Sequence, residues 1–206
     1  MLKIPNFTNG GGKVVKHQEI RETLIRNTIA VIANEGLDRT TTKAIVRGTN
    51  INEAYIYRFF EDKIDLMAKA FAQLDEELLE KAVQHVAVMG MRDMDFETRC
   101  KLYFTALWNF LLQNREKCLA YVRYYYSPYF MSRSEKEHFD RFTPVVEEFS
   151  KGFKSEANTR ALLEHALNAM LDFAVKVLNG LLPNDDDSAE HIFRVVYNSV
   201  KDYLKV

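Results

Sequence analysis

The stretch from Gly36 to Leu66 constrains the fold more than any other part of this 206-residue chain. Its spacing predicts two short helices joined by a tight turn, with a third helix following at once. Thr40 and Thr41 offer hydroxyls that can cap the first of these helices, which is expected over residues 42–49. This layout indicates a helix-turn-helix.

The turn between the two short helices needs a residue that tolerates left-handed backbone angles. Asn50 is predicted to supply it, because asparagine adopts these angles more readily than other non-glycine residues. Gly48 is expected inside the end of the preceding helix, where glycine costs about 1 kcal/mol relative to alanine. Asn52 can cap the second helix, expected over residues 53–60. The side chains predicted to form the core here are Ile45, Ile51, Ile56 and Phe60.

The face of this second helix opposite its buried side chains is polar and aromatic. An α-helix fits the major groove of DNA, and side chains at its leading end come within reach of base edges and phosphates. The pattern therefore favours a protein that binds DNA. The residues on this face are Glu53, Ala54, Tyr55, Tyr57 and Arg58.

Residues 17–66 resemble the N-terminal DNA-binding domain of the tetracycline-repressor (TetR) family of transcriptional regulators, and the spacing matches without a gap. Three positions depart from the family pattern. Asn50 stands where glycine is usual, Ala54 where a glycine or another small residue is usual, and Glu61 where proline is common. The matching residues are Gly36, Thr40, Thr41, Ile45, Ile51, Ile56, Tyr57, Phe59, Phe60, Lys63 and Leu66.

Tyr57 and Lys63 are the expected phosphate contacts, by this resemblance and because the start of a helix carries exposed N–H groups and partial positive charge. Thr41 is expected chiefly to cap its helix, with a phosphate contact as a second role. Glu53 can accept a hydrogen bond from a cytosine amino group, or it can serve only to reject other sequences. The resemblance implies base or backbone contacts for Lys43, Asn52, Glu53, Tyr55 and Arg58.

Net charge is −1 for the whole chain, which by itself does not favour DNA binding. Residues 1–66 contain ten Lys or Arg against eight Asp or Glu, so this part carries +2 and the remainder −3. Two copies in a dimer would double the local positive field. A charge of +2 is equally compatible with an ordinary solvated surface.

The sequence predicts an all-α chain with three parts. Residues 1–16 are expected to form a flexible arm, residues 17–66 the helix-turn-helix domain, and residues 67–206 a helical effector-binding and dimerisation domain. A long helix from Lys63 toward Val86 would connect the two domains, with Asp75 and its neighbouring acids on faces away from the apolar stripe. About nine helices are expected, the later ones over residues 98–115, 117–126, 134–153, 159–179 and 188–204.

The resemblance implies a homodimer in which the last two helices form a four-helix bundle with their copies. Both helices have long apolar stripes, part of which must cover their own subunit. The candidate interface residues are Leu162, Ala166, Met170, Phe173, Val177, Ile192, Val196 and Val200.

Aromatic residues are concentrated in the middle of the chain, with six rings between residues 121 and 130. An aromatic stripe at helical spacing usually forms core. The alternative is a cavity for a small lipophilic or aromatic effector, which the resemblance also places in this region. The candidate lining residues are Phe104, Trp108, Tyr121, Tyr125 and Met131.

The sequence contains no pattern of an enzyme, and neither a metal nor another cofactor is expected. No two of the five histidines are spaced i,i+4. Cys118 and His138 are interpreted as a buried thiol and a surface histidine. The longest apolar runs fall short of the roughly 20 residues of a membrane span, and two isolated cysteines, with no signal peptide, suit a reducing cytoplasm.

These features predict a ligand-responsive regulator, most often a repressor in the TetR family, that binds a palindromic double-stranded DNA operator as a homodimer. The alternative is a helical dimeric protein of the same fold that acts mainly through a protein partner. The low basic charge and Glu53 on the DNA-facing helix favour this alternative.

Overall fold

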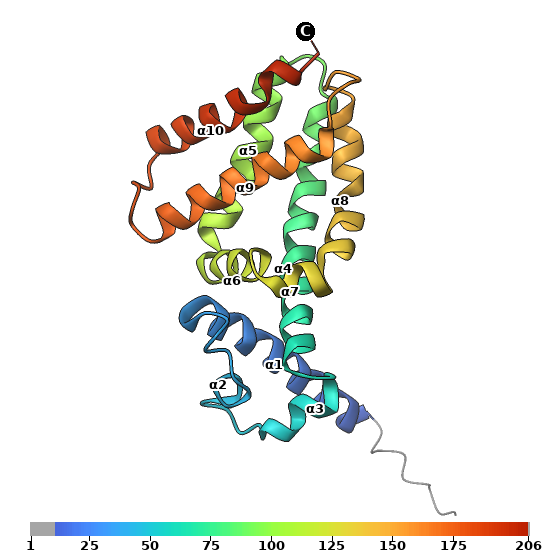
Figure 1. Ribbon diagram of the computed structural model, residues 1–206, viewed down its shortest axis with the longest axis vertical. Helices are drawn as coiled ribbons and strands as arrows, with labels where there is room; N and C mark the ends of the chain where they lie inside the picture. Colours follow the sequence, from blue (N-terminus) through green and yellow to red (C-terminus); the bar gives the residue numbers. More distant parts are fainter. Residues whose placement is uncertain (1–10, 206) are drawn as a thin grey trace, which may run out of the picture.

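The computed structural model describes the backbone of residues 11–205 and the side chains from His17 onward, and it confirms the predicted all-α fold (Figure 1). In the first half of the chain, the helices are α1 (Gly11–Glu35), α2 (Thr42–Val46), α3 (Ile56–Phe59), α4 (Lys63–Val86) and α5 (Phe96–Gln113). In the second half they are α6 (Arg115–Tyr125), α7 (Pro128–Arg133), α8 (Glu135–Ser150), α9 (Thr159–Leu178) and α10 (Asp186–Val200). Short 3₁₀ turns cover Glu53–Tyr55, Ala87–Gly90 and Lys201–Tyr203.

The helices form a small lower body and a larger upper body (Figure 1). Helices α1, α2 and α3 make the lower body, and α5 to α10 make the upper one. Helix α4 begins in the lower body and runs far into the upper one, beside α8. Helix α6 lies across the junction and packs on α1. The long connecting helix expected from the sequence is therefore present.

The arm was expected over residues 1–16, and its first ten residues lie outside the described part of the chain. From Gly11 onward the backbone already belongs to α1, six residues before His17, where the helix-turn-helix domain was expected to begin. Gly36, with φ of 87°, follows the last residue of α1 and adopts the left-handed conformation typical of a helix terminus.

The turn after α2 corrects one prediction. Helix α2 ends at Val46 rather than near residue 49, and the left-handed residue is Gly48, with φ of 75°. Asn50 has no positive φ. Glycine lacks the Cβ that makes this conformation costly, so the chain uses it in preference to the nearby asparagine. Gly48 is thus a turn residue outside the helix.

Capping side chains fix the starts of the short helices as expected. The Thr41 hydroxyl accepts a hydrogen bond from the amide of Ala44 at 3.1 Å, and the Asn52 side chain accepts one from Ala54 at 2.9 Å. The predicted second helix is split into the 3₁₀ turn Glu53–Tyr55 and the α-helical turn α3. Together they still present one continuous helical segment to solvent.

The core of the lower body contains three of the four predicted residues. Ile45, Ile56 and Phe60 are buried, whereas Ile51 is only partly buried against them. Asn27 of α1 also donates a hydrogen bond to the carbonyl of Ile45 at 3.0 Å, which fixes α2 on α1.

Ten α-helices occur in the described residues, against about nine expected. The additional helix is α7, which lies between the helices expected over residues 117–126 and 134–153. Proline is well tolerated at the first position of a helix, because that N–H has no partner within the helix. Over the described residues, no helix combines the length and apolar character required to cross a membrane.

Candidate nucleic-acid interface and effector cavity

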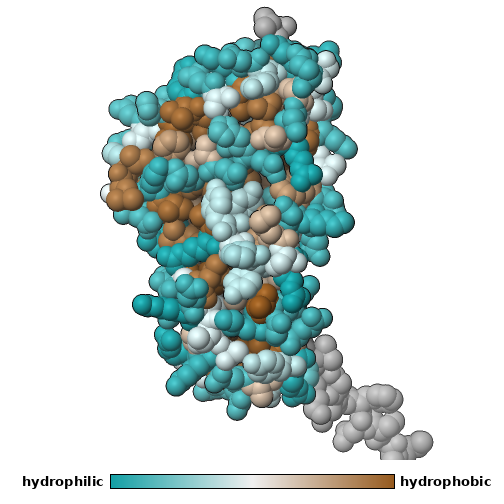
Figure 2. Space-filling model, in the orientation of Figure 1, coloured by the Kyte–Doolittle hydropathy of each residue, from teal (hydrophilic) through white to brown (hydrophobic). Residues whose placement is uncertain are grey.

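The predicted DNA-facing residues lie together at the free end of the lower body, where α2 and α3 are located (Figure 1). Tyr57 is 63% exposed, which is unusual for a large aromatic side chain. Figure 2 shows that this end of the molecule is mostly hydrophilic. The exposed members of the predicted set are Thr41, Lys43, Asn52, Tyr57 and Arg58.

Glu53 has a partner inside the protein that the sequence did not reveal. Its carboxylate accepts a hydrogen bond from the hydroxyl of Thr42, the first residue of α2. This contact joins α2 to the turn that precedes α3. Glu53 is partly buried, so its carboxylate is held in one orientation, and any contact with a base would use its remaining lone pairs.

Tyr55 and Arg58 support each other on the same segment. The Arg58 guanidinium lies 5.4 Å from the centre of the Tyr55 ring, and that ring stacks on Phe59 at 6.4 Å. A cation over an aromatic face is attracted by the ring quadrupole. Arg58 is therefore positioned over the surface of α3 while its charge stays accessible.

Lys63 is the first residue of α4, whose N-terminus also carries several acids. Asp62 caps the helix through a hydrogen bond from the amide of Asp65 at 2.7 Å. The Asp65 side chain in turn accepts a hydrogen bond from the amide of Glu61 at 3.1 Å. Asp62 thus occupies one N–H group of the helix start and Asp65 one in the preceding turn, which leaves the ammonium of Lys63 as the group suited to a phosphate.

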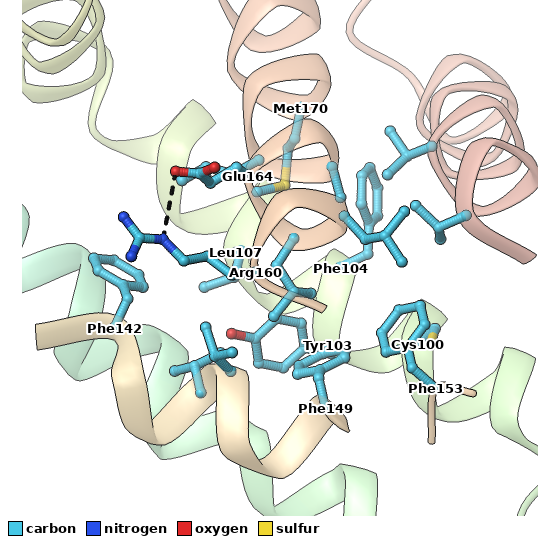
Figure 3. A pocket seen from close by; sticks show the side chains of 18 of the residues that line it. Cys100, Tyr103, Phe104, Leu107, Phe142, Phe149, Phe153, Arg160, Glu164 and Met170 are labelled. Atoms are coloured by element: carbon cyan, nitrogen blue, oxygen red, sulfur yellow. Dashed lines mark ion pairs between the residues drawn. The ribbon is translucent and has the colours of Figure 1, made fainter. Parts of the chain in front are cut away.

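The upper body contains an apolar cavity of about 210 Å³ between α5, α8, α9 and α10. Figure 3 shows aromatic side chains from α5 and α8 around it, with the Tyr103 hydroxyl among them. Burial raises the pKa of Tyr103, so this hydroxyl keeps its proton at neutral pH. Arg160 and Glu164, 4.0 Å apart, supply charge to the lining.

Only one of the five predicted lining residues reaches this cavity. Phe104 lines it, whereas Trp108, whose ring stacks on Phe104 with 5.7 Å between the ring centres, does not. Tyr121 and Tyr125 stack on each other at 5.8 Å, outside its lining, and Met131 is 70% exposed on α7. The prediction for Met131 is therefore corrected, because the short helix α7 turns this side chain to solvent. Most of the rings between residues 121 and 130 form core.

The predicted dimer-interface residues are mostly enclosed within one subunit. Figure 2 shows apolar surface over the region of α9 and α10. Leu181, in the loop between these helices, and Val195 of α10 have exposed side chains. Within one subunit the apolar stripes of α9 and α10 face α5 and the cavity, and the interface with a second copy stays a prediction. Met170, Val177, Ile192, Val196 and Val200 are buried, and Leu162, Ala166 and Phe173 are partly buried.

A buried polar cluster joins α4, α6 and α8. Asp75 of α4 is 0% exposed and accepts hydrogen bonds from three side chains. They come from His138 Nδ1 at 2.7 Å, Arg141 at 3.1 Å and the Tyr121 hydroxyl at 3.2 Å. Burial, followed by the Asp75 carboxylate, raises the pKa of Tyr121 well above its ordinary range, which keeps its hydroxyl as a donor.

This cluster corrects two expectations. His138 is 2% exposed rather than at the surface, and Asp75 lies inside although it was expected away from the apolar stripe. The two residues are 63 positions apart, so no local pattern connects them. Cys118 is buried as predicted, and burial raises the pKa of its thiol to about 12, which makes it unreactive.

The two bodies also meet through Arg123 of α6. Its guanidinium donates hydrogen bonds to the carbonyls of Ile32 at 2.7 Å and Ala33 at 2.9 Å, near the C-terminus of α1. The Ile32 carbonyl also accepts a hydrogen bond from the amide of Gly36 at 3.1 Å. Both carbonyls lie at the negative end of the helix dipole, so a cation is favoured there. Among the described residues, no group of histidine, cysteine and acidic side chains could hold a metal ion.

Comparisons with known proteins agree with this geometry. Residues 24–70 match the family model described as bacterial regulatory proteins, tetR family. No curated protein matches the chain in sequence. Many solved structures share its fold over most of the chain, among them the following three.

The first is a TetR family transcription regulator from Marinobacter aquaeolei VT8, with 16% identity, a TM-score of 0.68, and coverage of 90% of this chain and 97% of that one. The second, a TetR-family regulator from Haemophilus influenzae Rd, has 15% identity, a TM-score of 0.63, and coverage of 92% and 98%. The third is the fatty acid degradation regulator FadR from Bacillus halodurans, with 14% identity, a TM-score of 0.64, and coverage of 85% and 96%. At these identities the matches establish the fold, and the family model identifies the domain that binds DNA. Regulators of this kind bind DNA and are not enzymes.

Proposed function

We propose that this chain, which carries the DNA-binding domain of the TetR family, is a homodimeric repressor that binds a palindromic operator and releases it when a lipophilic effector fills the cavity. The observation that supports DNA binding best is the exposed face of α2 and α3, where Tyr57 lies in solvent and Lys63 opens the helix α4 that follows. A protein that binds bacterial DNA would act in the cytoplasm.

Operator contacts in this proposal come from two groups of side chains. Tyr57, Lys63 and Thr41 contact phosphates, which positions the domain on the duplex. Bases are contacted from the exposed ends of α2 and α3, since only base-edge contacts distinguish sequences directly. The candidates for these base contacts are Lys43, Asn52, Tyr55 and Arg58, with Glu53 restrained by Thr42.

Dimerisation in this proposal uses the outer faces of α9 and α10, because their inner faces already cover the subunit's own core. Val195, 42% exposed, and the partly buried Phe173 are among the apolar side chains of these helices that remain accessible. A two-fold axis beside these helices would place two copies of α3 on one face of DNA, as an inverted repeat requires.

The effector response in this proposal runs through α4. This helix begins at Lys63, beside the DNA-facing segment, and its middle carries Asp75, which bonds to His138 in the cavity wall. Release of DNA requires an effector that binds one arrangement of α4 more tightly than the other. The apolar lining favours a lipophilic molecule, and FadR from Bacillus halodurans, one of the structural matches, is named for fatty acid degradation.

Selection of binding sites from random double-stranded DNA tests this function. The expected result is an inverted repeat, with affinity that falls steeply between two salt concentrations. Tyr57→Ala combined with Lys63→Ala should abolish binding while light scattering still reports a dimer, and Lys69→Ala, an exposed lysine further along α4, is the matched control. A well-folded dimer that enriches no sequence would contradict the proposal and favour action through a protein partner.

A further inference from the structure

We infer that the cavity holds a neutral lipophilic molecule with a hydroxyl group, and that His138 Nε2 accepts the hydrogen bond of that hydroxyl. This inference rests on the proposed effector role of the cavity and specifies its ligand. It starts from a histidine that is 2% exposed and yet belongs to the cavity lining.

Asp75 determines which nitrogen of His138 carries the proton. The carboxylate oxygen lies 2.7 Å from Nδ1, and a carboxylate accepts hydrogen bonds, so Nδ1 is the donor. Arg141 already balances the charge of Asp75 at 3.1 Å, which makes a neutral imidazole sufficient. In a neutral imidazole with a proton on Nδ1, Nε2 is an acceptor.

Nε2 has no hydrogen-bond partner among the residues that the structure describes. In these residues, every fully enclosed side-chain nitrogen or oxygen has a hydrogen-bond partner. Nε2 has none, so it is not fully enclosed. Nε2 therefore retains accessible surface, and in a residue buried from solvent that surface faces the cavity. An acceptor left unpaired in an apolar site costs free energy, so a ligand that donates to it is favoured.

The rest of the wall defines the remainder of the ligand. Phe139 and Phe142, adjacent to His138 at 5.0 and 4.8 Å between ring centres, line the same cavity together with side chains such as Leu107 and Met170 (Figure 3). A cavity of 150 Å³ holds benzene in another protein, so 210 Å³ has room for about eight non-hydrogen atoms. Arg160 is itself occupied, at 3.7 Å from the Phe139 ring centre and beside Glu164.

The test compares three small molecules by titration calorimetry with the full chain in the absence of DNA. n-Heptanol and hexyl methyl ether are isomers, and only the alcohol can donate a hydrogen bond; heptanoate adds a charge. We expect n-heptanol to bind about tenfold more tightly than the ether, the difference expected of one hydrogen bond in a dry site, and heptanoate to bind most weakly. Equal affinities for the two isomers, or tightest binding of heptanoate, would overturn the inference while leaving the effector cavity in place.

Two substitutions at His138 assign the preference to one nitrogen. In His138→Asn the amide occupies the place of Nδ1 and preserves the bond to Asp75. The ratio of the affinities for n-heptanol and the ether should then fall from about ten to about one. In His138→Gln the amide occupies the place of Nε2, so the preference should be retained. An unchanged preference in His138→Asn would contradict the inference, and if a variant does not fold, the wild-type comparison decides alone. If none of the three molecules binds, both this inference and the proposed effector role of the cavity are contradicted. DNA site selection still tests DNA binding separately.

Discussion

In the lower body the polar side chains of α2 and α3 lie at the surface, whereas at the junction of α4, α6 and α8 they surround one buried carboxylate. The lower set depends on short local contacts: Thr41 and Asn52 cap the segment on which they lie. The buried set joins residues from three helices that are far apart in sequence. The difference indicates two uses of polarity, one for a charged partner in water and one for a connection between helices.

The energetic consequences of this difference can be stated. Surface polar contacts are exchanged readily with water and contribute little to stability, while a buried charge depends entirely on its partners. Substitutions in the buried cluster should therefore change the free energy of unfolding, and substitutions on the surface of α3 should change DNA affinity alone. Four substitutions, from the largest expected effect to the smallest, test this separation.

Asp75→Ala should have the largest effect. It leaves Arg141, His138 and Tyr121 without their common acceptor; because Arg141 is 30% exposed, we expect a cost of about 2–3 kcal/mol, below that of a fully buried ion pair. Denaturant unfolding measures the loss. Glu76→Ala, at an exposed neighbouring position, should change stability by less than about 0.5 kcal/mol. Equal effects of the two substitutions would show that Asp75 is not the centre of a stabilising cluster.

Arg123→Leu should be the next in size. It removes two hydrogen bonds to the carbonyls of Ile32 and Ala33 and leaves the end of α1 without its cation, which we expect to cost about 1–2 kcal/mol. Arg133→Leu, an exposed arginine in the last turn of α7, is the control. Both variants are compared by thermal unfolding. A loss of stability confined to Arg133→Leu would contradict the assigned contact between α6 and α1.

Gly48→Ala tests the corrected turn in the lower body. A side chain at φ of 75° is strained by about 1–2 kcal/mol even though nothing lies within 4 Å of the added Cβ. Gly90→Ala also adds a Cβ in open space but at an ordinary φ, so it should be nearly neutral. Asn50→Gly should give no gain in stability. If Gly48→Ala were neutral while the control Gly90→Ala were destabilising, the turn would not depend on Gly48. The original expectation that Asn50 forms the turn would then be restored.

The sequence predicted the lower body well because its determinants are local. A cap needs a hydroxyl or amide two or three residues from its amide, and Thr41 and Asn52 satisfy that rule on sight. The error at Asn50 arose because α2 was expected to continue past Gly48. It ends at Val46, so Gly48 lies in the turn, where glycine adopts left-handed angles at lower cost than asparagine.

The upper body was harder to predict because its determinants are tertiary. Asp75 follows an apolar stripe in α4, and a single acid beside such a stripe is usually solvated; only the approach of α8 encloses it. The stripes of α9 and α10 could cover either their own subunit or a second copy, and the sequence contains no signal that separates the two. Rings such as Tyr121 and Phe104 are alike in sequence, yet only Phe104 reaches the cavity.

Thr42→Val should have the smallest effect on stability and the most specific effect on DNA. The substitution keeps the shape of the side chain and removes the hydroxyl that donates to Glu53, which costs about 0.5–1.5 kcal/mol for one partly exposed hydrogen bond. Once released, the carboxylate of Glu53 is free to rotate, so discrimination at one base pair of the operator should weaken while affinity for the rest of the site is retained. Site selection with the variant and with Glu53→Gln measures this. If both variants select the wild-type operator with undiminished preference at every position, Glu53 serves only to join α2 and α3, and base recognition rests with Lys43, Asn52, Tyr55 and Arg58.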